Sequence, residues 1–373
     1  MHILLIFTFD YSLDMWSKTK ILDRELKYFK YINENYPDIK FSILTYGNEK
    51  DFEFFDKNQN INIIPAYSII KYNKSKIFRY IKSIILPFKL KKLIKDIDII
   101  KQFQLHGSWI SILIKYLINK PLYIRTGYDM YRFSIYENKN LIKKKLYKYL
   151  TFLALKYSDA YSVTSYSDKY FLEEKFKLNK KIEVIPNWVM LGKNKEYNQR
   201  FENKVLSVGR LESQKNFYEL IALFSNSNIE IDIIGQGSLL KELREIKEKF
   251  NSKINFLGKI GFNELQDKYS EYKVFVTTSN YEGNPKTILE AQANGCIVVS
   301  LYEENINELI ENEKDGFICS RENFLKTVEM ILKNNSDAKN ISNNAQKKSL
   351  RNNSLEFTVL KEIDLLNKLN NFI

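Results

Sequence analysis

The stretch Val274–Val299, VFVTTSNYEGNPKTILEAQANGCIVV, decides the fold of this chain. It predicts a buried strand, a polar loop, a helix and a second buried strand, which is the pattern of a parallel α/β unit. Asn284 and Pro285 stand where the helix is expected to start, an Asn able to cap it and a Pro suited to its first position.

The first turn of this helix is predicted to bind phosphate, because free backbone N–H groups coincide there with the positive end of the helix dipole. Those N–H groups belong to Lys286, Thr287 and Ile288. Two carboxylates stand eight positions apart, Glu282 in the loop and Glu290 inside the helix. We therefore take this stretch as the working site.

Length and charge limit the classes of protein that fit. A chain of 373 residues, 44% hydrophobic, is too long for one core and suggests two domains rather than disorder. The net charge of +13 is concentrated in the N-terminal half, where Lys71–Lys95 carries nine Lys or Arg and no acid. The two cysteines show neither metal-ligand nor disulfide spacing, so a reducing cytoplasm is expected. The chain shows no signal peptide and no apolar run of about 20 residues, so we expect a soluble or peripherally attached protein.

Strands and helices alternate along both halves of the chain, which predicts two Rossmann-like α/β domains with parallel sheets. A polar segment at 186–199 separates them. We expect an N-terminal domain at 1–189, a C-terminal domain at 190–350, and a C-terminal helix at 351–373 that packs back on the first domain. Ligands of such sheets bind at the carboxyl ends of the strands, here expected to face a central cleft. Strands are predicted at 3–9, 40–46, 61–65, 98–103, 122–125, 160–164, 182–185, 204–208, 230–234, 254–257 and 315–319, in addition to the opening stretch.

A second cluster of candidate residues opens the C-terminal half. Gly209 and Arg210 follow a predicted strand, and Lys215 stands five residues after Arg210, just before a helix. This order places two cations at one strand end, where Arg binds phosphate with two parallel hydrogen bonds and Lys adds a point charge. The turns at Gly235 and before Lys259 are candidates for binding a nucleotide, with a simple tight turn as the alternative.

Residues 205–299 closely resemble the donor-binding domain of the retaining glycosyltransferases of family 4, which have the GT-B fold. The segments VLSVGRLESQKN, IIGQGSLLKEL and FLGKI, followed by the opening stretch, carry this resemblance in the family's order.

The resemblance implies a nucleotide-diphosphate sugar as donor, UDP- or GDP-linked, and roles for individual residues. Arg210 and Lys215 would bind the diphosphate, Glu290 the ribose hydroxyls, and Glu282 the sugar. The backbone of residues 283–286 would hold the sugar too. Two cations and a helix N-terminus stabilise a leaving diphosphate without metal, so we expect neither a cofactor nor a metal ion. The predicted donor-binding residues are Gly209, Arg210, Lys215, Gly235, Lys259, Glu282, Gly283, Asn284, Pro285, Lys286, Thr287, Ile288 and Glu290, with Glu282, Arg210 and Lys215 as the catalytic set.

The first half resembles the family less well. Its segments KQFQLHGSW and KPLYIRTGYD are similar to members that build bacterial surface polysaccharides. His106 follows a predicted strand and is a candidate for the acceptor side, with a partly buried loop histidine as the alternative. Arg125, Tyr128 and Asp129 end another strand and are either acceptor contacts or an ordinary salt-bridged turn.

Lys71–Lys95 is predicted to be helical, broken into two pieces at Pro87. Its cations alternate with Ile, Phe and Tyr, which suits the surface of an anionic inner membrane, with a merely solvated face as the alternative. Nucleic acid is not an expected partner, because no binding motif accompanies the charge.

The sequence thus predicts a metal-independent glycosyltransferase of the hexosyltransferase type. It would retain configuration and act on a lipid-linked or oligosaccharide acceptor in capsule, O-antigen or related surface-polysaccharide synthesis, at the cytoplasmic face of the plasma membrane. Two alternatives remain: a nucleotide-sugar epimerase or hydrolase of the same fold, and a non-catalytic nucleotide-sugar-binding subunit at the membrane.

Overall fold

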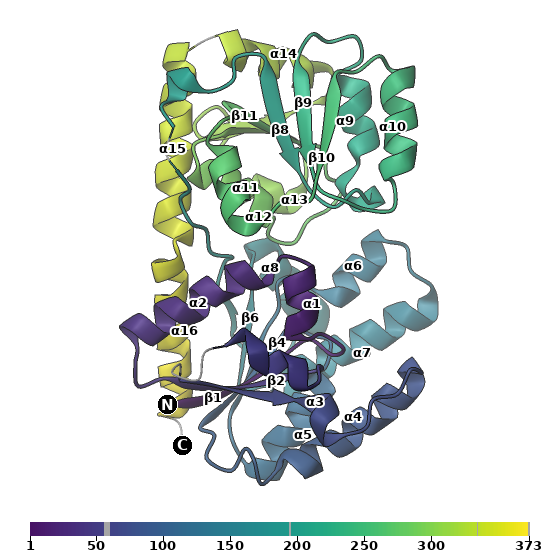
Figure 1. Cartoon of the computed structure of the whole chain (residues 1–373), viewed down its shortest axis with the longest axis vertical. Helices are drawn as coiled ribbons and strands as arrows, with labels where there is room; N and C mark the ends of the chain where they lie inside the picture. The colour runs from purple at the N-terminus through teal and green to yellow at the C-terminus, as the bar shows by residue number, and fades with distance from the viewer. Residues whose placement is uncertain (56–59, 194, 334, 372–373) are drawn as a thin grey trace. The chain divides into compact units, whose positions relative to one another are not determined.

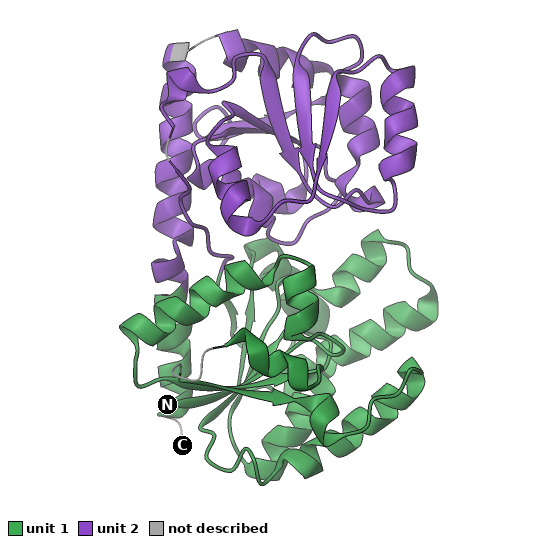
Figure 2. Cartoon of the chain, in the orientation of Figure 1, with its two compact units in different colours: residues 1–185, 359–373 green, residues 186–358 purple. Residues whose placement is uncertain are grey.

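The computed structural model describes residues 1–55, 60–193, 195–333 and 335–371. The last two residues of the predicted C-terminal helix lie outside these ranges. The chain forms two compact units, residues 1–185 with 359–373 (unit 1) and residues 186–358 (unit 2; Figure 2). The chain therefore passes from one unit to the other twice, whereas the sequence placed the divisions at 189/190 and 350/351.

Unit 1 is built on a sheet of seven parallel strands in the order β3-β2-β1-β4-β5-β6-β7 (Figure 1). The register pairs Ile3 of β1 with Phe41 on one side and Ile99 on the other. Most residues of its central strands are buried because helices cover both faces of a parallel sheet, and β4 includes the buried polar residues Lys101 and Gln102. The strands are β1 (His2–Ile6), β2 (Lys40–Thr45), β3 (Ile61–Pro65), β4 (Ile99–Phe103), β5 (Leu122–Arg125), β6 (Ala160–Val163) and β7 (Ile182–Val184).

Side-chain caps start several helices of unit 1. Ser12, Asn140 and Ser165 each accept a hydrogen bond from a backbone N–H in the first turn of the following helix. The helices are α1 (Leu13–Lys18), α2 (Leu22–Asn35), α3 (Ala66–Ile69), α4 (Lys76–Leu90), α5 (Ser108–Ile118), α6 (Met130–Tyr136), α7 (Leu141–Tyr157) and α8 (Tyr166–Phe176), with a 3₁₀ turn η1 at Glu49–Phe54.

The predicted break at Pro87 is wrong, because α4 runs through it as one helix. Proline removes the hydrogen bond to the carbonyl four residues earlier, but α4 ends at Leu90, so few later bonds depend on that turn. Leu86, Pro87 and Leu90 are buried, and α4 packs against α5. Burial of these side chains holds the turn together.

A buried ion pair attaches the C-terminal helix α16 (Leu355–Asn370) to unit 1. Glu362 of α16 lies 2.6 Å from the Lys101 ammonium on β4, and both side chains are less than 5% exposed. The Tyr28 hydroxyl donates to the second Glu362 oxygen at 2.7 Å, and Lys101 donates to Tyr28 at 3.1 Å. Residues 359–373 thus complete a unit whose remaining residues come from the other end of the chain.

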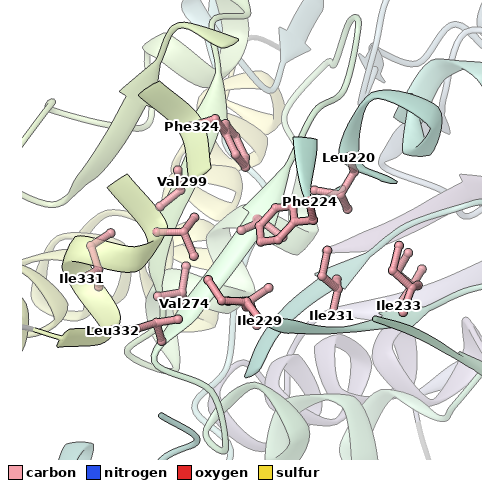
Figure 3. Packing of buried hydrophobic residues seen from close by; sticks show 14 of the residues in the cluster. Leu220, Phe224, Ile229, Ile231, Ile233, Val274, Val299, Phe324, Ile331 and Leu332 are labelled. Carbon is pink, nitrogen blue, oxygen red and sulfur yellow. The ribbon is translucent and has the colours of Figure 1, made fainter. Parts of the chain in front are cut away.

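Unit 2 contains six parallel strands in the order β10-β9-β8-β11-β12-β13. Alternate strand residues enter two separate cores. Ile231 and Ile233 pack with Phe224 and Phe324 on one face (Figure 3), whereas Phe275 packs on the other face against α11 and α12. The elements are η2 (Tyr197–Gln199), β8 (Lys204–Val208), η3 (Ser213–Lys215), α9 (Phe217–Leu223), β9 (Glu230–Ile234), α10 (Leu240–Lys249), β10 (Ile254–Gly258), α11 (Phe262–Tyr269), β11 (Val274–Thr277), α12 (Lys286–Ala293), β12 (Ile297–Leu301), α13 (Glu304–Asn307), β13 (Gly316–Cys319), α14 (Arg321–Lys333) and α15 (Asn335–Asn353).

Within the described part of the chain, no helix combines the length and the apolar character needed to cross a bilayer.

Candidate functional site

The loop between β11 and α12 differs from its prediction at Asn284, which does not cap the helix. The Asn284 side-chain oxygen accepts from the backbone N–H of Asn187 at 3.1 Å, and its carbonyl accepts from the Asn187 amide at 2.8 Å. Ile288 is not free as predicted, because its N–H donates to the Pro285 carbonyl at 3.1 Å. Asn284 therefore connects the loop to Asn187, and its side-chain oxygen is not available to cap α12.

Lys215 and Glu282 form a largely buried ion pair at the carboxyl ends of β8 and β11. Arg210 lies at the same end of β8 and donates to the Gln214 side chain at 2.8 Å. Gln214 in turn donates to the Tyr281 carbonyl at 3.0 Å. The two predicted cations are thus both linked to the loop that carries Glu282, although the sequence had assigned Lys215 and Glu282 to separate tasks.

Two residues that the sequence did not single out hold the Glu282 peptide on both sides. Glu303 accepts a hydrogen bond from the Glu282 N–H at 3.2 Å and another from the Ile306 N–H at 3.0 Å. Asn305 donates to the Glu282 carbonyl. Burial raises the pKa of Glu303 to about 7, and the nearby charge of Glu282 adds to this, while the N–H donors oppose it. Their position after a buried strand was the signal that could have revealed them.

Glu290 lies inside α12 and is 4% exposed. Its carboxylate accepts a hydrogen bond from the Tyr269 hydroxyl at 3.3 Å. Burial raises the pKa of Tyr269 well above its usual value, and the Glu290 charge raises it further, so the phenol stays a donor. Glu290 is therefore held in place from the side of α11.

Close backbone packing explains the glycine turn after β9. A side chain at Gly235, where φ is 154°, would place its Cβ 1.8 Å from the Gly209 carbonyl oxygen. A Cβ at Gly237 would lie 2.3 Å from the Leu211 carbonyl oxygen. Both glycines are needed because two strand-end loops approach each other closely here, and the nucleotide-binding role of Gly235 stays a prediction.

The remaining predicted donor residues lie on the same unit. Gly283 and Pro285 are buried in the loop before α12, whereas Lys286 and Thr287 at its first turn are half-buried. Lys259, directly after β10, is half-buried too.

His106 is half-buried in an aromatic cluster of unit 1. Its Nε2 lies 3.0 Å from the Tyr80 hydroxyl, and its ring makes edge contacts with Phe9 and Trp109. Burial lowers the pKa of His106, and the charge of Lys76 lowers it further. His106 is thus partly buried, and its acceptor-side role stays a prediction.

Asp129 needs correction as an acceptor contact. It is fully buried, and its two oxygens accept from the Arg132 N–H at 2.7 Å and the Thr151 hydroxyl at 3.0 Å. Asp129 is the N-cap of α6. Because a buried carboxylate needs hydrogen-bond donors from within the fold, both of its oxygens are already used. Arg125 is also buried and donates to the Ile185 carbonyl at 3.4 Å. Tyr128, 42% exposed, is the most accessible of the three predicted residues at this turn.

Across the ranges that the structure describes, no group of three or more His, Cys, Asp or Glu side chains is arranged to hold a metal ion.

Two family descriptions match successive parts of the chain. "Glycosyltransferase Family 4" matches residues 39–193, and "Glycosyl transferases group 1" matches residues 193–348. Together they cover the strands of both sheets from β2 to β13. The chain is a glycosyltransferase.

Named relatives of this glycosyltransferase come from bacterial glycan synthesis. An α-1,4-N-acetyl-D-galactosaminyltransferase of Campylobacter jejuni, named for an undecaprenol-diphosphate-linked acceptor, is 27% identical over 70% of this chain and 73% of its own length. An α-1,3-galactosyltransferase of Escherichia coli, named for UDP-Gal and a diphosphoundecaprenol acceptor, is 28% identical over 77% of this chain and 78% of its own.

Solved structures share the fold. HepE of Anabaena, in complex with UDP and glucose, matches 99% of this chain and 100% of its own with a TM-score of 0.73 at 13% identity. Sucrose-phosphate synthase of Thermosynechococcus elongatus matches all of both chains with a TM-score of 0.76 at 14% identity. The glycosyltransferase therefore has the predicted GT-B fold.

Proposed function

We propose that this glycosyltransferase moves a sugar from a UDP- or GDP-linked donor to a lipid-linked glycan acceptor, with retention of configuration and without a metal ion. The observation that carries this proposal is the Lys215–Glu282 pair, built beside Arg210 and the first turn of α12. The proposed setting is the synthesis of capsule, O-antigen or another surface polysaccharide.

In this proposal the donor diphosphate binds between Arg210, Lys215 and the N-terminal turn of α12. A Lys ammonium has three donors, so Lys215 can contact Glu282 and a phosphate oxygen together. When the sugar leaves, negative charge grows on the diphosphate, and the two cations with the helix N-terminus stabilise it. No metal ion is required for this stabilisation.

The two carboxylates have different tasks. Glu282 accepts hydrogen bonds from the sugar hydroxyls, together with the loop backbone at 283–286. Glu290 accepts from the ribose hydroxyls, with Tyr269 fixing its orientation. The donor's own phosphate receives the acceptor proton on the face from which it departs, so the new bond keeps the old configuration.

The names of the relatives support a lipid-linked acceptor, because undecaprenol-diphosphate appears in those from C. jejuni and E. coli. Such an acceptor lies at a membrane surface, and α4 is suited to meet it. The apolar side chains on its outer side are each at least half exposed, and the segment carries no acid. This surface of α4, with the basic residues up to Lys95, is proposed to contact the anionic inner membrane.

The donor site is tested with a panel of UDP- and GDP-linked hexoses, scored by release of nucleoside diphosphate in the presence of a polyprenyl-diphosphate-linked sugar. Glu290→Gln should raise the KM for the donor about 10- to 100-fold, because a hydrogen bond to a charged group is worth about 1.5–3 kcal/mol. Glu245→Gln, an exposed carboxylate on α10, is the matched control and should leave the KM unchanged.

Equal kinetics of Glu290→Gln and wild type would remove Glu290 from the ribose role. A product of inverted anomeric configuration by NMR would refute retention. Turnover abolished by EDTA and restored by Mg²⁺ would refute a metal-independent reaction.

The proposed membrane contact of α4 is tested with the Lys89, Lys91 and Lys92→Glu variant, whose three lysines are exposed. It should float less with anionic vesicles while its thermal shift with the donor nucleotide persists. Unaltered flotation would refute the contact.

A further inference from the structure

Helix α7 turns an apolar stripe away from the body of unit 1. Ile142, Leu146 and Tyr149 follow one another at spacings of four and three residues and are 80%, 59% and 61% exposed. Leu141 at the start of the helix is 73% exposed. The buried side of α7 consists of Thr151, Ala154 and Leu155. A surface helix normally places its apolar stripe on the buried side, so this one lacks its expected cover.

The same helix is strongly basic. Residues 141–157 contain five lysines and no acid. Lys143, Lys145 and Lys148 are exposed and lie along the apolar stripe. A helix with apolar side chains flanked by lysines matches the boundary between headgroups and acyl chains of an anionic bilayer.

Helix α7 lies near α4 within unit 1. Both pack against α5, and Figure 1 shows them on the same side of the unit. The two outward apolar stripes therefore belong to one side of the unit.

We infer that the first two turns of α7 form a second membrane-binding element, which lies with α4 in the headgroup region of an anionic bilayer. The biological reason for this binding, an acceptor at the membrane, rests on the proposed function, whereas the binding itself does not. A bilayer is favoured over a protein because both stripes are uniformly cationic, and two such faces would repel each other in a symmetric pair.

The test is flotation with vesicles of equal parts phosphatidylglycerol and phosphatidylcholine, against vesicles of phosphatidylcholine alone. Each lysine near an anionic surface is worth about fivefold in partition, the equivalent of ~1 kcal/mol. Lys143, Lys145 and Lys148→Glu should therefore weaken partition into anionic vesicles by on the order of 100-fold. The control variant changes three exposed lysines of unit 2, Lys241, Lys249 and Lys339, to Glu and should retain more of the binding.

A second variant tests the apolar stripe. Ile142, Leu146 and Tyr149→Ser should weaken partition as well, whereas Met330 and Leu360→Ser, two exposed apolar residues elsewhere, should not. Full vesicle binding by either α7 variant would overturn the inference, even if the α4 variant lost binding and so supported the proposed function. A dimer that becomes a monomer in the Ser variant, by sedimentation, would overturn it in favour of a second copy.

A separate observation concerns the donor loop. Glu303 and Asn305 stand on either side of the start of α13, and together they bind the N–H and the carbonyl of Glu282.

The geometry points to Glu303 and Asn305 as positioning residues that set the direction in which Glu282 presents its carboxylate. This rests on the proposed function, in which Glu282 contacts the donor sugar. An ionised Glu303 can accept from both N–H groups, whereas its protonated form loses part of that capacity. The charged groups on its side are Glu282 and, through that residue, Lys215.

Glu303→Gln should lower kcat/KM about tenfold, while affinity for the nucleoside diphosphate alone stays at the wild-type level. The wild-type pH profile should fall below an inflection at about 7, and the inflection should disappear in the variant. Glu304→Gln, the exposed neighbour, is the control and should keep both. An unchanged profile in Glu303→Gln would overturn the positioning role, whereas a wild type without any turnover would instead refute the proposed function.

Discussion

Removal of Glu362 is expected to destabilise unit 1 strongly. Glu362→Gln would leave the Lys101 ammonium, 4% exposed, without its counter-charge. Breaking a buried pair from one side typically costs about 3–5 kcal/mol, because the remaining charge stays desolvated. The Gln oxygen can still accept from Tyr28, so the loss should come from Lys101.

The assay is urea unfolding followed by tryptophan fluorescence in a Trp188→Phe background, because Trp16 and Trp109 then report on unit 1 alone. Asp364→Asn is the matched control on the same helix: its pair with Lys368 is about two-thirds exposed on each side and should contribute at most about 1 kcal/mol. Adding Lys101→Met to Glu362→Gln should recover most of the lost stability.

The pH dependence has a definite sign. Burial tends to raise the pKa of Glu362, but the charges of Lys101 and Arg125 outweigh it and lower the pKa below its ordinary value of 4.5. The stabilisation is therefore present above about pH 4.5 and is lost as the pH falls through the lowered value. A Glu362→Gln variant within 1 kcal/mol of wild type at pH 7 would refute the reasoning.

Three further predictions concern other sites. Burial raises the pKa of Asp129 from 3.8 to about 6, so the stability that its proton contributes below pH 3.8 is lost as the pH rises through 6, and Asp129→Asn should flatten the urea midpoint over that window. Gly235→Ala should cost at least about 1–3 kcal/mol in thermal unfolding, because φ is 154° and a carbonyl oxygen blocks the Cβ. Gly261→Ala, with open space around it, should be nearly neutral. Tyr269→Phe removes the hydroxyl that Glu290 accepts from and should raise the donor KM several-fold, by about 1 kcal/mol of lost hydrogen bonding.

The sequence predicted the sheets well because parallel strands read as short, wholly apolar runs. The limits of β3, β5, β8 and β9 agree with the predicted ones. It missed α1 and α6, which have only 6 and 7 residues and so show too few turns for a helical period, and it also missed α8. It misjudged Pro87, since the local cost of a proline does not reveal that the neighbouring side chains are buried.

The sequence identified several residues of the site but not the contacts between them. Lys215 and Glu282 were both named, but their contact joins residues 67 positions apart and was not visible in either motif. Glu303 and Asn305 were missed because they bind a backbone peptide, so no side-chain motif marks them and only their position after the buried strand β12 points to them. Asn284 and Asp129 were misassigned because tertiary partners, Asn187 and Thr151, determine what their side chains bind.

The ion pair between Lys101 and Glu362 also fixes an order of events during synthesis. Unit 2 is one continuous segment and can fold as soon as it has left the ribosome. The contact of Tyr28 with Glu362 in unit 1 cannot form until the middle of α16 is made, because the two residues lie 334 positions apart in sequence. Until then the Lys101 ammonium on β4 lacks its counter-charge and must stay hydrated. The half of the enzyme that is translated first is therefore the half that finishes folding last.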